Sequence, residues 1–300
     1  MFSFRTFGKA CVTVSGVLTL TAIILIIFPG PTFSIEFTGG SFLELQLPEK
    51  FTKEDVIMAM RKMNDGNVAF DNVSISATRE KTFLLRLRTL SSEEHSALLE
   101  HLKKEFGTIV ELQFTTIGPT VGSSMAKRAF SALILALIGI VLYIAIAFRN
   151  IPAKYSPWKF GVTAVISLIH VVLLTIGIFV ILSHTTSFEF DTLFVTALLT
   201  IIGYAVNDTI VIFDRLRDNL SSQHRTETFE VVASRSLIQS LTRSLNTGVA
   251  TFIMLICLFF LGPANIQWFI LALIIGFAIG TYSSIGLATP LLVYWRGRQE

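Results

Sequence analysis

One acidic residue, Asp208, lies within an otherwise apolar part of the chain, between residues 201–206 and 209–213. If this stretch forms a membrane helix, a carboxylate lies where lipid would otherwise surround it, at a cost of ~2.5–3.5 kcal/mol at the helix centre. Asp214 marks the expected membrane exit, roughly 9 Å further along the helix, and an Asp side chain is too short to reach water over that distance. Because an acidic residue inside a membrane helix usually has a function, Asp208 is the first candidate for proton transfer.

Three other polar residues of the apolar stretches qualify for the same chemistry. Arg243 begins the fifth stretch and is the candidate cation for Asp208, although an interfacial Arg commonly reaches the lipid headgroups instead. Asn207 could hydrogen-bond either protonation state of Asp208, but it faces about 100° away on the helix and could simply pack between helices. His170 could relay a proton, yet such a residue more often makes an interhelical hydrogen bond.

The composition identifies an integral membrane protein. The chain is 52% hydrophobic and only 15% charged, with 26 Phe and a mean hydropathy of +0.67, which excludes an ordinary soluble fold. Apolar stretches of about the length of a membrane span occur at residues 10–28, 129–148, 160–182, 193–213, 245–261 and 266–294. The first is too long for a signal peptide core and lacks a small-residue cleavage site, so we expect an uncleaved helix. Cys11 and Cys257 lie in apolar stretches and predict no disulfide framework.

The distribution of Lys and Arg predicts the orientation. Between the apolar stretches, residues 184–190 and 262–265 contain neither, so these connections are expected outside the cytoplasm. The connections between the second and third and between the fourth and fifth apolar stretches, and both ends of the chain, are basic and are expected in the cytoplasm. Their basic residues are Arg5, Lys9, Arg149, Lys154, Lys159, Arg215, Arg217, Arg225, Arg235, Arg243, Arg296 and Arg298. Both termini are therefore predicted to be cytoplasmic.

Residues 30–127 form the one long polar segment and are expected as an extracytoplasmic domain, between a first helix at 1–29 and a five-helix membrane domain at 128–300. Its pattern is βαββαβ, a ferredoxin-like α+β unit: an extended segment at 33–47, a helix after a Thr52–Asp55 capping signal, strands at 67–77 and 82–90 joined by a turn at Arg79–Lys81, a helix from a Ser91–Glu94 capping box to Phe106, and a strand at 108–117. The double glycine Gly39-Gly40 indicates a bulge or a close backbone approach.

No sequence pattern in this domain predicts an enzyme. There is no nucleophile elbow, Walker A pattern, zinc-ligand spacing or dinucleotide fingerprint, so we expect no cofactor or metal and interpret the domain as a binding or mechanical module. Glycines at both junctions predict hinges between the domain and the membrane helices. The cytoplasmic connector at 214–242 mixes Arg with acidic residues, which favours helices along the membrane surface over a nucleic-acid site. Gly276 and Gly280 form a GxxxG pattern typical of close helix packing.

Several motifs along the chain together resemble the SecF family of bacterial protein-export subunits. They are Phe37-Thr38-Gly39-Gly40, Gly118-Pro119-Thr120-Val121-Gly122, the segment 206–220 from Val206 through Asp208, Asp214 and Arg215, Thr242-Arg243-Ser244-Leu245-Asn246-Thr247, and Gly280-Thr281-Tyr282-Ser283-Ser284. Their order and the number of apolar stretches fit the family over essentially the whole chain. One position departs from the family pattern: Glu36 stands where Asp usually precedes the Phe-Thr-Gly-Gly motif, which keeps the charge and changes the reach.

The resemblance implies a proton-driven accessory subunit of the Sec translocase in the bacterial inner membrane. SecD and the SecYEG channel are the implied partners, with YajC and YidC as further candidates and an unfolded preprotein as the substrate. It implies a proton relay of Asp208, Arg243 and Asn207, and family-motif roles for Glu36, Phe37, Thr38, Gly39, Gly40, Asp214, Arg215, Asn246 and Thr247. Two alternatives stay open at this point: half of a small-molecule exporter of the resistance-nodulation-division superfamily, and a passive membrane scaffold.

Overall fold

Six membrane-spanning helices dominate the described part of the chain. The computed structural model describes residues 4–48, 51–64, 74–77, 82–148, 157–222 and 227–296, and within them six helices are long and apolar enough to cross a membrane. This confirms the multi-pass helical fold with a small α+β domain. The turn at Arg79–Lys81 and the basic residues Arg149, Lys154, Arg225 and Arg298 lie outside the described residues.

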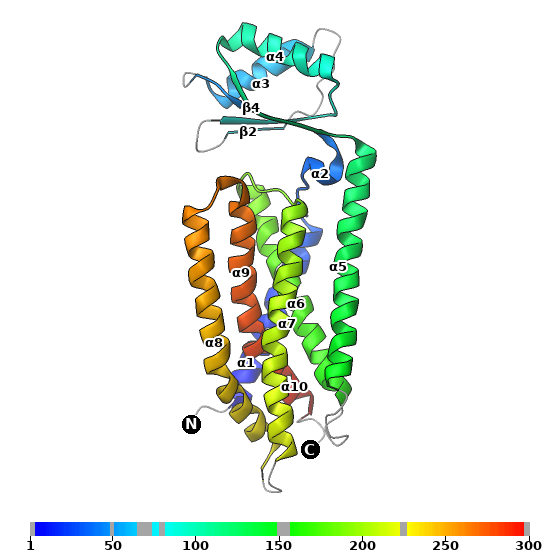
Figure 1. Cartoon of the computed structure of the whole chain (residues 1–300), viewed down its shortest axis with the longest axis vertical. Coiled ribbons are helices and arrows are strands. Elements are labelled where there is room, and N and C mark those ends of the chain that lie inside the picture. The colour runs from blue at the N-terminus through cyan, green and yellow to red at the C-terminus, as the bar shows by residue number, and fades with distance from the viewer. Residues whose placement is uncertain are drawn as a thin grey trace. The chain divides into compact units, whose positions relative to one another are not determined.

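The chain divides into two compact units. The helix unit comprises Met1–Pro31, Ala132–Leu182 and Leu193–Glu300, and the sheet unit comprises Thr32–Ser131 together with Ser183–Thr192. The helix unit is a bundle of long helices, shown in Figure 1. The long helices are α1 (Phe4–Ile27), α5 (Pro119–Ala147), α6 (Pro157–Thr185), α7 (Thr192–Ser221), α8 (Phe229–Leu261) and α9 (Gln267–Ser283), and α9 leads through a π-helical turn at Ser284–Ala288 into α10 (Thr289–Arg296).

The structure corrects the prediction for the 214–242 connector. Instead of separate helices along the membrane surface, α7 continues to Ser221 and α8 starts at Phe229. The apolar residues that suggested surface helices are used in packing along these extensions, since Leu216, Leu220, Phe229 and Val232 are all buried.

Small residues let the helices of the helix unit approach closely. A Cβ added to Gly276 of α9 would lie 2.2 Å from Ile201 Cδ1, and one added to Gly280 would lie 3.1 Å from Ala205 Cβ, so the GxxxG face packs on α7 as the sequence predicted. Buried polar residues also join helices. Thr19 of α1 shares a hydrogen bond of 2.6 Å with His170 Nδ1 of α6, which places His170 in the interhelical role.

The sheet unit has the ferredoxin-like topology. Its antiparallel strands are β1 (Gly40–Gln46), β2 (Ser74–Ala77), β3 (Thr82–Leu87) and β4 (Val110–Ile117), in the order β2-β3-β1-β4, and its longer helices are α3 (Lys53–Asn64) and α4 (Ser92–Phe106). Residues 33–39 differ from prediction. The extended segment was expected from residue 33, but Ile35–Thr38 form a short helix, α2, that Ser34 caps by accepting a hydrogen bond from the Glu36 amide.

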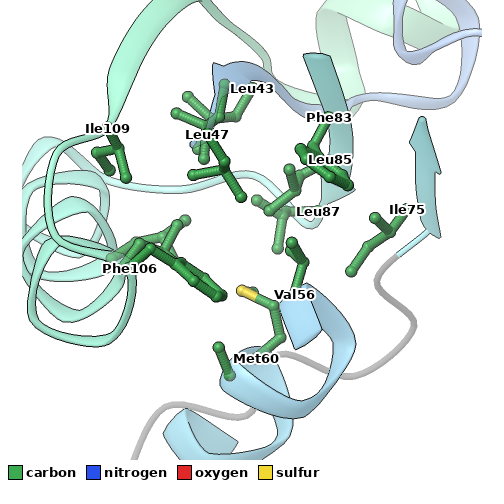
Figure 2. Close-up of a cluster of buried hydrophobic side chains, with 14 of the residues drawn as sticks. Leu43, Leu47, Val56, Met60, Ile75, Phe83, Leu85, Leu87, Phe106 and Ile109 are labelled. Carbon is green, nitrogen blue, oxygen red and sulfur yellow. The ribbon is translucent and has the colours of Figure 1, made fainter. Parts of the chain in front are cut away.

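The core of the sheet unit lies between one sheet face and the helices α3 and α4 (Figure 2). Alternate residues of β1 and β3 point into it, and Leu43, Leu85, Val56 and Leu98 are completely buried. Both predicted capping signals form hydrogen bonds: the Thr52 amide donates to Asp55 Oδ2 at 2.8 Å, and Ser91 and Glu94 make a reciprocal capping box.

The motif glycines of the two junctions pack against each other. Gly39 and Gly40 have φ angles of 76° and 131°, a region that glycine adopts far more readily than other residues. A Cβ on Gly39 would lie 2.8 Å from Pro119 Cα, and one on Gly122 would lie 2.7 Å from the Gly39 nitrogen. The close-approach interpretation of Gly39-Gly40 is thus confirmed. The two glycine motifs form one packed structure, and the hinge role predicted for them stays a prediction.

Candidate functional site

Asp208 is buried in the helix unit, with 4% of its surface exposed. It lies in the middle of α7, which the sequence predicts from the apolar residues on either side. Its side chain faces α8, where Ser244 lies beside its carboxyl group. Oδ2 of Asp208 is buried and has no hydrogen-bond partner among the described residues.

Three hydroxyl side chains accompany this carboxyl group, and we call Asp208, Tyr204, Ser244 and Thr281 the Asp208 cluster. Tyr204 precedes Asp208 by one helical turn on α7, and its ring stacks on Phe277 of α9 at 4.0 Å. Thr281 of α9 lies near the Tyr204 hydroxyl, and Gly248 of α8 leaves room for both. The hydroxyl oxygens of Tyr204, Ser244 and Thr281 are also buried without a hydrogen-bond partner within the described residues.

Buried polar atoms without partners require an explanation, because each costs roughly 1–3 kcal/mol. Here four of them gather where α7, α8 and α9 meet. A carboxyl group can give up a proton or take one, and hydroxyl groups both donate and accept hydrogen bonds. The arrangement therefore suits the exchange of a proton at Asp208. It does not suit a metal ion held by several acids or imidazoles, since no such group of three occurs in the described ranges.

The structure does not bring Arg243 or Asn207 into this cluster. Both side chains are on exposed surfaces, Arg243 on α8 and Asn207 on α7, and Arg243 makes no ion pair with Asp208 in the described part of the chain. The relay role of Arg243 stays a prediction, and the structure adds that its side chain does not contact Asp208 within the described residues. The next residue, Ser244, is the one that faces Asp208, because consecutive helical residues point about 100° apart.

Sequence reasoning missed Tyr204, Ser244 and Thr281 as site residues. Two signals were present in the sequence. Tyr204 is four residues before Asp208 and so shares its helix face, while Ser244 and Thr281 occur inside motifs that resemble the family. Hydroxyl side chains in membrane helices are common packing residues, and only the fold shows that these three meet at the same acid.

Arg243 belongs instead to an exposed polar stripe on α8. Asn246, Thr247 and Thr251 follow it at helical spacing, and the Thr247 hydroxyl donates to the Arg243 carbonyl at 3.0 Å. On α7, Thr196, Thr200 and Asn207 form a second exposed stripe. Polar side chains at membrane depth seldom face lipid, which makes the exposed Asn207, Arg243 and Asn246 candidates for contact with another protein segment.

The Asp214 and Arg215 end of the family motif connects α7 to α8. Arg215 Nε donates to Gln239 Oε1 at 2.8 Å, and Asn219 donates to the same oxygen at 2.9 Å and to Ser236 Oγ at 2.8 Å. Asp214 pairs with Arg217 one turn later, at 2.8 Å. These contacts fix the position of α8 on α7, and with it the position of Ser244 beside Asp208.

The Phe-Thr-Gly-Gly motif and Glu36 occur in the sheet unit, in and beside α2. Phe33 packs edge-on against Phe37, Thr38 donates to the Ser34 carbonyl at 3.1 Å, and Glu36 accepts two hydrogen bonds from Thr192. These residues hold local structure together and are not part of the Asp208 cluster.

Known proteins resemble this chain along most of its length. The family model for the C-terminal part of the protein export membrane protein SecD/SecF matches residues 97–298. The protein translocase subunit SecF of Thermobaculum terrenum is 40% identical over 290 residues, covering 92% of this chain and 90% of the relative, and SecF of Synechocystis is 36% identical with coverages of 87% and 82%.

Longer relatives also contain the same region. SecDF of Bacillus subtilis is 30% identical over 95% of this chain, which spans 37% of that protein. The crystal structure of SecDF from Thermus thermophilus, a translocon-associated membrane protein, matches 99% of this chain with a TM-score of 0.84 and 29% identity, and this chain spans 39% of it. The motifs, the six-helix fold with its ferredoxin-like unit and these similarities agree, and the chain belongs to the SecF family of protein translocase subunits.

Proposed function

We propose that this chain is an accessory subunit of the Sec translocase that uses the proton gradient to promote preprotein export. The observation that carries the proton step is the Asp208 cluster, a membrane carboxyl group with three hydroxyl neighbours and no hydrogen-bond partner for its Oδ2 in the described residues. Family membership supports the export role. The small-molecule exporter is not favoured by these relatives, and a passive scaffold would not need a titrating acid at this depth.

In the proposed cycle, Asp208 takes a proton from one side of the membrane and releases it to the other. The hydroxyl groups of Tyr204, Ser244 and Thr281, which have no partner among the described residues, are available to either form, because a hydroxyl can donate to a carboxylate and accept from a carboxylic acid. Moving one charge across the membrane field is worth about 2.3 kcal/mol per 100 mV. This free energy is enough to shift a two-state equilibrium of the helices about fifty-fold.

Substituting Asp208 tests the proton step. Asp208→Asn keeps the size of the side chain and cannot titrate, so we expect proton-gradient stimulation of preprotein export to be lost while the complex still assembles. Asp218→Asn is the matched control, since Asp218 lies on the same helix with its side chain 55% exposed. Export would be measured in inverted membrane vesicles with an imposed gradient. Normal stimulation with Asp208→Asn would reject the proposal.

The exposed polar stripes lead us to propose SecD as the cover of α7 and α8. Relatives in which this region is fused into SecDF support such a partner. After replacement of Cys11 and Cys257, cysteines at Asn207, Asn246 or Thr247 should cross-link to SecD in native membranes. A cysteine at Ile253, an apolar α8 residue with 59% exposure, is the control and should label with lipid-soluble reagents instead. If only the cysteine at Ile253 cross-links to SecD, the proposed contact surface is wrong.

The remaining partners and the orientation follow the same proposal. We place the chain in the bacterial inner membrane with both termini in the cytoplasm, acting on preproteins that leave the SecYEG channel, with YajC and YidC as further associated proteins. Affinity purification of the tagged chain from native membranes should recover SecD and SecYEG. Protease treatment of sealed vesicles of each orientation would locate tags at the two termini, and protection in the same orientation for both is the expected result.

A further inference from the structure

The segment Ser183–Thr192, which connects α6 to α7, belongs to the sheet unit. It is attached there by backbone hydrogen bonds: the Phe190 amide donates to the Thr32 carbonyl at 2.9 Å, and the Ser34 amide donates to the Phe190 carbonyl at 3.0 Å. Phe190 is 5% exposed, and its ring lies 6.1 Å from that of Phe33. This connection is therefore held like an added strand beside residues 32–34.

Glu36 extends this attachment to the first residue of α7. Its Oε2 accepts a hydrogen bond from the Thr192 amide at 2.9 Å and a second one from the Thr192 hydroxyl at 2.6 Å. The first amides of a helix have no acceptor within the helix, and a negative charge at this end is favourable. Glu36 thus caps α7 from a segment 156 positions earlier in the sequence.

A second polar contact joins the same connection to the sheet. Arg86 of β3 pairs with Glu189 at 2.7 Å, and both side chains are largely buried, at 19% and 17% exposure. Glu189, Phe190 and Thr192 thus attach the end of this connection to the sheet unit at three nearby positions. The start of α7 is consequently fixed to β3 and to α2 at once.

We propose that Glu36 is a positioning residue: by capping α7 at Thr192 it makes the start of the helix that carries Asp208 move as one body with the sheet unit. This inference rests on the proposed function, since it concerns how a change at Asp208 is passed to the sheet unit. Glu36 touches no reacting atom. Its side chain acts only by accepting the two hydrogen bonds from Thr192.

Three variants in the full chain with its partners test the proposal. Glu36→Ala removes the acceptor, and we expect the Thr192 amide to exchange with solvent roughly tenfold faster or more, together with a large loss of gradient-stimulated export. Glu36→Gln keeps an acceptor oxygen and should restore most of both. Glu44→Ala is the matched control: Glu44 accepts from the Thr82 hydroxyl at 2.8 Å, an equivalent contact that stays inside the sheet, and it should leave both readouts unchanged.

Hydrogen exchange measured by mass spectrometry separates the possible results. Faster exchange at the start of α7 with unchanged protection of β1, and reduced export, supports the proposal. Reduced export without faster exchange at Thr192, or faster exchange with normal export, overturns it. Global loss of protection with Glu36→Ala would shift the test to Thr192→Val, which keeps side-chain volume and removes only the hydroxyl donor. Normal gradient stimulation of export with Asp208→Asn would reject the proton step separately, because this substitution does not change amide exchange at Thr192.

Discussion

Two carboxylates of this chain differ sharply in their surroundings. Glu36 in the sheet unit receives two hydrogen bonds from Thr192, whereas Oδ2 of Asp208 in the helix unit receives none among the described residues. Both are shielded from solvent to a large extent, so exposure does not explain the difference. A carboxylate that accepts two hydrogen bonds from the start of a helix holds that start in place. The Asp208 carboxyl group instead lies among hydroxyl groups, which can donate to a carboxylate and accept from a carboxylic acid.

The same contrast extends to the packing around each acid. The sheet unit has a single apolar core on one face of its sheet, with its main helices started by hydrogen-bonded caps. The helix unit gathers hydroxyl groups at the centre of three helices and leaves their oxygens unpaired in the described structure. We infer that the sheet unit is built to stay in one state and that the Asp208 cluster is built to alternate.

The largest expected effect tests the rigidity of the sheet unit. Leu85→Ala removes a completely buried side chain from the strand at the middle of the core (Figure 2), and should lower the free energy of unfolding of this unit by about 2–5 kcal/mol. Val110→Ala is the control, because Val110 on β4 is 48% exposed and should change it by less than about 1 kcal/mol. Pulse proteolysis of the full chain in urea measures both. Equal effects would show that the core does not dominate this unit.

A pair of tyrosines tests the Asp208 cluster. Tyr204→Phe removes a hydroxyl without a hydrogen-bond partner in the described residues, so stability should change little while gradient-stimulated export falls roughly tenfold. Tyr282→Phe removes a hydroxyl that shares a 3.0 Å hydrogen bond with Ser15, so it should cost about 1 kcal/mol of stability with little change in the response to the gradient. The reverse pattern would contradict the proposed role of Tyr204.

Sequence alone predicted the membrane spans and the ferredoxin-like unit because both depend on local patterns. An apolar run long enough to cross a membrane, a strand with alternating apolar residues and a helix-capping signal can each be recognised within about 20 consecutive residues. The partner of Asp208 was not accessible in this way. Arg243 and Ser244 are adjacent in sequence, and which of them faces α7 depends on the rotation of α8, set by contacts such as Arg215 with Gln239. The Glu36 contact was missed for a related reason, since Thr192 is far away in sequence and carries no motif.

Glu189 provides a pH test of the sheet unit. Burial raises the pKa of Glu189 to about 7, Arg86 opposes this shift, and the charge of Asp191 adds to it. Because the folded state holds the proton more tightly than the unfolded chain, the free energy of unfolding should fall as pH rises from about 4.5 to about 7 and level off above. The fall should be on the order of 1–2 kcal/mol, and Glu189→Gln should remove it. Amide hydrogen exchange of residues 183–192, measured across this pH range, gives the pH dependence of the free energy of unfolding. If Glu189→Gln leaves that dependence unchanged, a group other than Glu189 causes it.

The smallest expected effects come from two helix caps, one in each unit. Ser91 caps α4 in a reciprocal box, accepting from the Glu94 amide at 3.2 Å while its own amide donates to Glu94 at 2.9 Å. Thr228 caps α8 with one hydrogen bond of 3.5 Å from the Val231 amide and has no acid at the matching position. Ser91→Ala should therefore cost about 1 kcal/mol, and Thr228→Ala only a few tenths.

The Ser91 cap should also persist in acid. Hydrogen bonds from Arg88 and from the Ser91 amide lower the pKa of Glu94 to about 2, so the cap contributes fully above the unfolded pKa near 4.5 and is lost only as pH falls toward 2. Amide exchange at the first turns of α4 and α8, compared at pH 7 and pH 4, measures both caps. A larger effect from Thr228→Ala than from Ser91→Ala would mean that the start of α8, and not that of α4, is the more tightly fixed, and would break the contrast between a rigid sheet unit and an adaptable helix unit.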